Sequence, residues 1–261
     1  MATPPESVLL ADIGATNARF AVLVRSEVAV SETYAVADHA SPVDAMRAFL
    51  TGPASSHRPQ RALIAAAGPV HAGRVTLTNA AWVVDPNRIA KALDMQDVRV
   101  LNDFEALGWS LPALQPDDLV TVGTPRGGER GTMAVLGPGT GFGLAALAYG
   151  RQEQIVLVTE GGHATLSSEN RREDAVILAL RHQLRHVSVE SVLSGPGLVD
   201  LYHAIAKTDG KSVPGRDNSE IIERARRESS GLGGDGRGRY GADAPARYRR
   251  WSNVGVRCAH A

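Results

Sequence analysis

The sequence predicts an α/β fold in which helices pack on mixed β-sheets. The first observation behind this prediction is the order of apolar segments in the N-terminal half: strand, strand, strand, helix, strand, helix. The second is a glycine-containing hairpin that occurs twice, at residues 10–22 and at residues 135–147. Because the two hairpins lie about half the chain apart, they indicate that the chain is organised in two parts.

Composition sets the broad class. A chain of 261 residues with 43% hydrophobic content can form one large or two modest cores. Its formal net charge of zero gives no reason to expect nucleic acid or an anionic membrane as a partner. No apolar run approaches the roughly 20 residues that span a bilayer. The N-terminus has no basic region typical of a signal peptide, so we expect a cytoplasmic protein. A single cysteine, Cys258, excludes an intrachain disulfide and a cysteine-rich zinc site.

The N-terminal elements follow from apolar patterning and from helix-start signals. Residues 8–24 predict two strands joined by a tight turn, and residues 28–36 predict a third strand. Ser41 and Pro42 are typical of a helix start, and this helix should reach Leu50. Strands at residues 61–70 and 75–79 precede a second helix, which begins at Asp85 and Pro86 and extends to residue 93.

Asn102 and Asp103 end the buried strand predicted at residues 98–101 and precede a helix. In open α/β sheets, ligands bind at the carboxyl ends of strands, so an amide and a carboxylate there form a candidate site. The alternative is that Asp103 only caps the helix and Asn102 fills a turn.

The two glycine turns are candidate phosphate sites. Gly14, with Thr16 and Asn17, can turn the chain while it directs backbone N–H groups and a hydroxyl outward. An ordinary hairpin turn has similar residues, so this alternative stays open. The second turn has the same chemistry in residues 137–141. Two such turns facing one another could hold a polyphosphate from both sides.

Further polar candidates follow later strands. Asn79 lies at a strand exit, where it could equally be a turn residue. Glu160 and His163 flank two glycines, and their alternatives are a solvated acid and a packed histidine. Beyond them, Asn170 with Glu173 resembles a capping box for one helix, and Ser194 is expected to cap another. A last helix is predicted at residues 219–226.

The composition changes at residue 229. Residues 229–261 contain seven Gly and six Arg but no Ile, Phe, Met, Lys or Glu, and show no helical or alternating pattern. We therefore expect little packed structure there. A basic tail that binds nucleic acid is the less favoured interpretation.

Five motifs in order carry a family resemblance: ADIGATNARF at residues 11–20, LNDF at 101–104, LGPGTG at 136–141, EGGH at 160–163 and ESVLSGPG at 190–197. Together they resemble bacterial glucokinase, an ATP-dependent hexose kinase family of the actin-like, ribonuclease-H-like superfamily. The resemblance covers residues 8–226. It implies two lobes, each with a βββαβ core, and sugar and nucleotide in the cleft between them. We assign residues 1–111 to the small lobe, 112–228 to an incomplete large lobe and 229–261 to the atypical tail.

The resemblance also implies a role for each matching residue. Asp103 would be the general base that accepts the proton of the 6-hydroxyl of glucose as this hydroxyl attacks the γ-phosphate of ATP. Asp12 would meet Mg²⁺ through water. A homodimer is plausible by resemblance only. The sugar ligands would be Asn79, Asn102, Glu160, His163 and Glu190. The residues that bind phosphate would be, in the first turn, Ala11, Asp12, Ile13, Gly14, Ala15 and Thr16, and, in the second turn, Gly137, Gly139, Thr140 and Gly141.

Two features depart from the family pattern. Ala15 stands where the family usually has a second glycine, which adds one methyl group near the phosphates. Nothing after Arg226 resembles the family's C-terminal helices, and we hypothesise a lost reading frame near residues 226–230. The coding DNA, read in all three frames, would test this.

The function expected is that of a glucokinase. The alternatives are a catalytically impaired glucokinase-like protein, a sugar-sensing regulator without kinase activity and an actin-like filament-forming ATPase.

Overall fold

The computed structural model describes residues 7–77, 80–120, 131–151 and 153–230. The chain forms two compact units, unit 1 (Met1–Leu107) and unit 2 (Gly108–Ala261). The division falls inside helix α3 (Asp103–Ser110), four residues before the end assigned above to the small lobe. The tail at residues 231–261 lies outside the described residues, so the expectation for it stays a prediction.

Unit 1 is built on a five-stranded sheet with the order β3-β2-β1-β4-β8. β2 is antiparallel to both β1 and β3, whereas β4 and β8 run parallel to β1. The carboxyl ends of β1, β4 and β8 therefore lie at one edge, where Ile13, Ala66 and Asn102 are in register. The strands are β1 (Ser7–Ile13), β2 (Asn17–Val24), β3 (Glu27–Ala35), β4 (Arg61–Ala66) and β8 (Asp97–Asn102).

One face of this sheet carries the main core. Alternate residues of the strands, such as Leu9, Phe20 and Ile64, are fully buried there, as period-2 patterning requires. They share the core with residues of α1 (Pro42–Thr51) and α2 (Pro86–Leu93). The predicted helix starts are confirmed, because Ser41 accepts a hydrogen bond from the N–H of Asp44 and Asp85 accepts from the first turn of α2. A 3₁₀ turn, η1 (Val36–Asp38), links β3 to α1.

The strand predicted at residues 61–70 is shorter than expected. β4 ends at Ala66, and Gly68 then adopts a φ of 142°, which favours glycine and takes the chain out of the sheet. The chain continues into a separate small sheet, whose order is β5-β6-β7. Its strands are β5 (Val70–His71), β6 (Arg74–Thr76) and β7 (Val83–Val84).

Unit 2 begins inside α3, and two 3₁₀ turns follow that helix, η2 (Leu111–Ala113) and η3 (Pro116–Asp118). β9 (Met133–Pro138), β10 (Phe142–Tyr149) and β11 (Gln154–Thr159) then form an antiparallel sheet with the order β11-β10-β9. This repeats the order of β3, β2 and β1 in unit 1. Among the described residues, however, no strand pairs with the outer edge of β9, the edge at which β1 carries β4.

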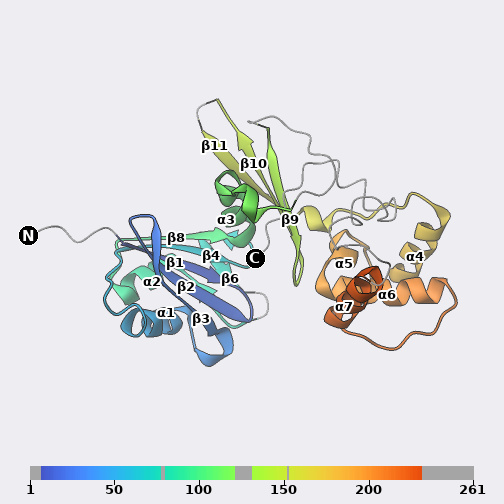
Figure 1. The fold of residues 1–261 in the computed structure, drawn as a ribbon, viewed down its shortest axis with the longest axis horizontal. Coiled ribbons are helices and arrows are strands. Elements are labelled where there is room, and N and C mark those ends of the chain that lie inside the picture. Colours follow the sequence, from blue (N-terminus) through green and yellow to red (C-terminus); the bar gives the residue numbers. More distant parts are fainter. Residues whose placement is uncertain (1–6, 78–79, 121–130, 152, 231–261) are drawn as a thin grey trace, which may run out of the picture. The chain divides into compact units, whose positions relative to one another are not determined.

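After β11, the described part of unit 2 is mainly helical (Figure 1). A second core there contains Ile177, Leu180 and Val192. As predicted, Asn170 caps α4 and Ser194 caps α6. The capping box is only partial, because the Glu173 carboxylate accepts from the N–H of Glu169 rather than that of Asn170. The elements are η4 (Gly161–His163), α4 (Arg171–Arg181), α5 (Glu190–Leu193), α6 (Gly195–Thr208) and α7 (Asn218–Ser230).

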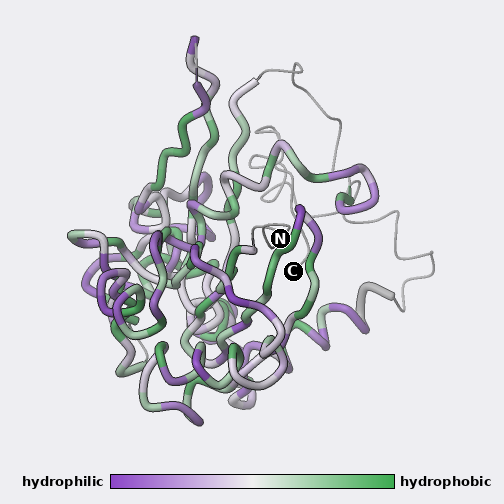
Figure 2. Tube along the Cα trace, turned by 90° about the vertical axis from the view of Figure 1, so that its left-hand side faces the viewer, coloured by the Kyte–Doolittle hydropathy of each residue, from purple (hydrophilic) through white to green (hydrophobic). Residues whose placement is uncertain are grey.

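Hydropathy along the chain follows these elements. Figure 2 shows hydrophobic stretches of the chain that alternate with hydrophilic ones. Within the described part of the chain, no helix is both long and apolar enough to cross a membrane.

Candidate active site

Asn102 joins strand β8 to helix α3 and holds both in place. Its Oδ1 accepts hydrogen bonds from the N–H groups of Phe104, at 2.9 Å, and Glu105, at 3.3 Å, so it caps the helix. Its Nδ2 donates to the carbonyl of Gly68 at 2.9 Å, which ties the exit of β8 to that of β4. The capping role considered for Asp103 therefore belongs mainly to Asn102.

Asp103 begins α3 at the sheet edge where β1, β4 and β8 all end. Its Oδ1 accepts from the N–H of Phe104 at 3.0 Å. Burial raises the pKa of the Asp103 carboxyl above its ordinary value, because desolvation disfavours the charged form; the negative charge of Asp12 raises it further. Hydrogen bonds from its own N–H, from Phe104 and from Asn102 oppose this shift. A carboxylate with a raised pKa is a stronger proton acceptor once ionised, which suits a general base.

The first glycine turn leaves the same edge. The N–H of Gly14 donates to the carbonyl of Asn17 at 2.9 Å and closes the hairpin, while the carbonyl of Thr16 accepts from Val36 at 2.9 Å. No described residue accepts the N–H groups of Ala15 and Thr16. These two donors are therefore the part of the turn that an anion could use.

Three other predicted residues of this turn belong to β1. Ala11 and Ile13 have buried side chains in the central strand, between β2 and β4, so they can act on a ligand only by holding the turn. The Asp12 side chain, in contrast, is 65% exposed, and its Oδ2 lies 4.0 Å from Nη1 of Arg19.

The second glycine turn is attached to the helices of unit 2. The N–H of Gly139 donates to the carbonyl of Gly141 at 2.8 Å, and the carbonyl of Gly139 accepts from the N–H of Gly195, the first residue of α6, at 2.9 Å. Thr140 at the tip is exposed, and Gly137 pairs with Gly143 in the strand ladder. The turn is thus supported from one side and open at its tip.

Glu160 and His163 flank the two glycines of η4. Their side chains are 74% and 61% exposed, with 3.6 Å between Oε2 of Glu160 and Nε2 of His163. A Cβ on Gly162 would meet the carbonyl oxygen of Phe142, and one on Gly161 would meet the side chain of Leu144. Gly162 is therefore required for this loop to lie against the start of β10, because a backbone atom cannot move aside as the end of the Leu144 side chain can.

Glu190, the first residue of α5, reaches the same place from another element. Its Oε2 accepts a hydrogen bond from the N–H of Phe142 at 2.7 Å. Phe142 thus contacts both the Glu160–His163 loop and Glu190, beside the second glycine turn. Unit 2 brings these predicted residues together around the first residue of β10.

Other parts of the structure were outside the sequence predictions. Phe142 was not a candidate, because it contacts Glu190 through its backbone N–H, and any residue type could make this contact.

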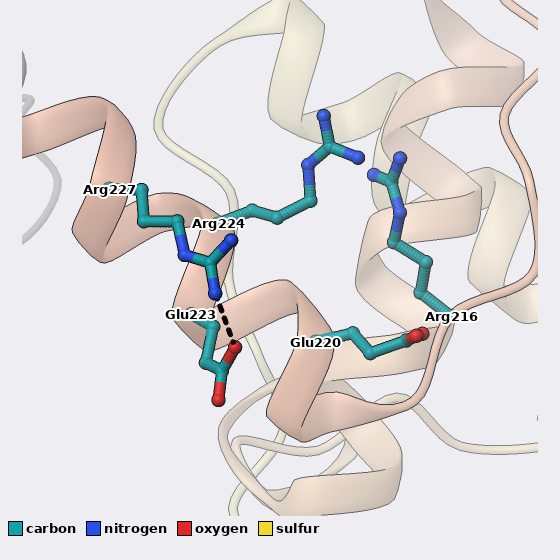
Figure 3. Close-up of a pocket in the computed structure, with 5 residues that line it drawn as sticks. All are labelled: Arg216, Glu220, Glu223, Arg224 and Arg227. Atoms are coloured by element: carbon teal, nitrogen blue, oxygen red, sulfur yellow. Dashed lines mark hydrogen bonds and ion pairs between the residues drawn. The ribbon is translucent and has the colours of Figure 1, made fainter.

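Asn79 lies outside the described residues. No cluster of three or more metal-ligating side chains occurs among those described. Figure 3 shows a hollow at α7, where Arg227 pairs with Glu223 at 3.2 Å; its lining contains none of the predicted site residues.

Comparison with known proteins identifies the family. A model of the family described as Glucokinase matches residues 9–232. "Glucokinase" of Nitrobacter hamburgensis is 37% identical over 221 residues, which cover 85% of this chain and 69% of that protein. "Glucokinase" of a Chelativorans species is 40% identical over 217 residues, which cover 82% of this chain and 63% of that protein. The chain therefore spans about two thirds of the length of these relatives.

Solved structures agree. The crystal structure of a glucokinase from an Antarctic psychrotroph matches with a TM-score of 0.76 at 35% sequence identity, covering 86% of this chain and 71% of that one. This match confirms the predicted fold class, an α/β fold of the actin-like type. Together with the match over residues 9–232, it shows that the chain belongs to the glucokinase family.

Proposed function

We propose that this chain transfers the γ-phosphate of ATP to the 6-hydroxyl of glucose or a related hexose, the first step of glycolysis. The observation that carries the proposal is the position of Asp103: a partly buried carboxyl with a raised pKa, at the sheet edge from which the first glycine turn also leaves. Family membership favours a kinase over a sugar-sensing regulator or a filament-forming ATPase.

The reaction needs one base and little other covalent chemistry. Asp103 takes the proton of the 6-hydroxyl as its oxygen forms a bond to the γ-phosphorus, and the bond between that phosphorus and the leaving ADP oxygen breaks. General base catalysis of this kind typically contributes about 10²–10⁴-fold to a rate. Positioning and charge stabilisation provide most of the remainder in phosphoryl transfer.

The sugar contacts come from carboxylate, amide and imidazole groups. A hexose presents hydroxyls, each of which donates and accepts hydrogen bonds, and a polar group left unpaired on binding costs roughly 1–3 kcal/mol. Glu160 and His163 are exposed and near one another, and the side chain of Asn102 lies beside Asp103, to which it donates a hydrogen bond. Asn79 belongs to the same proposed set.

The nucleotide contacts come from the two glycine turns. The N–H groups of Ala15 and Thr16 and the open tip at Thr140 would bind phosphate oxygens. Asp12 fits a Mg²⁺ held through water, because Mg²⁺ commonly keeps several waters and uses one or two carboxylates with substrate phosphates. When bound, the ion would neutralise charge on those phosphates.

The test is hexose-dependent release of ADP by the full chain. We expect turnover with glucose, abolished by Asp103→Ala while the affinity for glucose stays within a few-fold. Asp97→Asn is the matched control: it neutralises a carboxylate at the opposite end of β8, whose contacts are exposed ion pairs of little energetic weight. Retained turnover in Asp103→Ala would overturn the assignment of the base.

A chain without turnover would contradict the proposal. If glucose then still raised the melting temperature, the catalytically impaired alternative would hold, since a ligand that binds the native state stabilises it. A cytoplasmic location and a homodimer belong to this proposal as well. Sedimentation of the purified chain would test the homodimer, and cell fractionation would test the location.

A further inference from the structure

The carboxylate of Glu190 lies against the second glycine turn. Its Oε2 accepts the N–H of Phe142, the residue that follows Gly141, at 2.7 Å. A Cβ built on Gly141 would lie 2.6 Å from the same Oε2. Glycine is therefore needed at position 141 for this carboxylate to approach the backbone, whereas a Cβ on Gly139 would meet nothing within 4 Å.

The turn has a second attachment close by. The carbonyl of Gly139 accepts from the N–H of Gly195, five residues after Glu190. The segment from Glu190 to Gly195 thus holds one end of the turn through a side chain and the other end through a backbone N–H. Because the ladder of β9 and β10 alone would leave the turn free to bend, these two bonds define the direction in which its tip projects.

Only one oxygen of Glu190 is used in this way. No described residue donates a hydrogen bond to Oε1, although a sugar hydroxyl could. A carboxylate accepts at both oxygens, so one side chain can serve a backbone N–H and a ligand at the same time.

We propose that Glu190 is a positioning residue for the phosphate turn as well as a sugar ligand, so that one carboxylate links hexose binding to the geometry of the nucleotide site. This inference rests on the proposed function. A hexose hydroxyl on Oε1 orders the side chain, which in turn orders the N–H of Phe142 and the Gly139–Gly141 turn. Hexose and nucleotide should then bind with positive cooperativity, because the second ligand finds the link already ordered.

The first experiment measures the contact itself. In Glu190→Ala, the amide of Phe142 should exchange with deuterium at least tenfold faster than in the unaltered chain, whereas Glu190→Gln keeps an acceptor oxygen and should stay close to the unaltered rate. Equal protection in Glu190→Ala and the unaltered chain would overturn the inference. This measurement needs no turnover and no ligand.

A double-mutant cycle provides a second measurement without ligands. Gly141→Ala should lower the melting temperature because its methyl group displaces the carboxylate, and the effect should be much smaller when Glu190 is already alanine. Gly139→Ala, in the same turn but in open space, is the control and should lower it little in either background. Additive effects of Gly141→Ala and Glu190→Ala would contradict the proposed contact.

The third experiment separates positioning from sugar binding. The affinity for a non-hydrolysable ATP analogue without hexose should fall about tenfold in Glu190→Ala and recover in Glu190→Gln, and glucose should tighten analogue binding only when residue 190 retains its acceptor. A residue that acts only as a sugar ligand would leave the hexose-free affinity unchanged. If the unaltered chain did not bind the analogue, both the proposed function and the coupling of Glu190 to nucleotide binding would be wrong. Hydrogen exchange at the amide of Phe142 would still decide whether Glu190 holds the turn.

Discussion

At the scale of single residues, the two acids of unit 1 differ because their surroundings differ. Asp103 is partly buried at the end of β8, whereas Asp12 is exposed on β1 beside Arg19. Sequence alone indicated that both were site candidates but gave no means to predict that the pKa of Asp103 is raised. That shift depends on burial, which is set by the register of β1, β4 and β8 rather than by any local motif.

The charge of Asp12 provides a test of this environment. Because it raises the pKa of Asp103, Asp12→Asn should lower that pKa, and the acid limb of the pH profile of kcat/KM should move to lower pH. A ¹³C NMR titration of the Asp103 carboxyl measures the shift without any need for turnover. Asp97→Asn, at the far end of β8, should leave the titration unchanged. A rise of the Asp103 pKa in Asp12→Asn would contradict the expected sign.

The raised pKa of Asp103 should also affect the stability of the folded chain. A carboxyl whose pKa is higher in the folded than in the unfolded state favours folding below its unfolded pKa, and this contribution is lost as the pH rises through the folded pKa. Asp103→Asn should therefore raise the melting temperature at pH 7 although it removes the base. The gain should shrink as the pH falls through the raised pKa, which melting curves recorded from pH 7 downward would show. A gain independent of pH would point to another cause.

At the scale of elements, most boundaries could be predicted from the sequence. Helix starts at Ser41, Asp85 and Ser194 were identifiable because capping side chains act within three residues of their own position. The break at Gly68 and the split of that region into a second small sheet were missed. Gly68 has a positive φ, and a Cβ there would lie 3.2 Å from the side chain of Val75, a contact between separate segments that periodicity does not encode.

Asn102 connects strand β8 to helix α3, which begins with Asp103, the proposed base. Asn102→Ala removes the cap of α3 and the bond to Gly68, and should cost about 0.5–2 kcal/mol of unfolding free energy. Asn102→Ser keeps a capping oxygen and should recover part of this loss. Urea denaturation with both variants tests the assignment. If alanine and serine were equally stable, the capping role would be wrong.

The glycines of η4 allow a matched comparison. In Gly162→Ala the added methyl would meet the carbonyl of Phe142, so the loop or β10 must shift, at a cost of typically 1–3 kcal/mol. Gly139→Ala adds the same methyl in open space and should change the unfolding free energy far less. Denaturant midpoints of the two variants give the difference directly. Equal midpoints would show that the loop accommodates the methyl group without strain.

At the scale of the whole molecule, the duplicated hairpin was the most informative signal in the sequence. In the structure each hairpin is part of a three-stranded order that recurs, β3-β2-β1 in unit 1 and β11-β10-β9 in unit 2, and the third strand of each was not part of that signal. The grouping of Glu160, His163 and Glu190 around Phe142 was implied only by family resemblance, since it joins segments about 30 residues apart through backbone contacts. The roles of these residues stay predictions.

The bare flank of β9 has a consequence for handling the molecule. In unit 1, β4 pairs with the corresponding edge of β1, but among the described residues no strand pairs with that edge of β9. The backbone N–H and C=O groups of an unpaired edge strand can form hydrogen bonds with a strand of another chain. We therefore expect the purified chain to self-associate as it is concentrated, with sedimentation velocity showing larger species that disperse on dilution. A single slow-moving species at every concentration would contradict this. Storage in dilute solution should therefore limit the formation of these larger species.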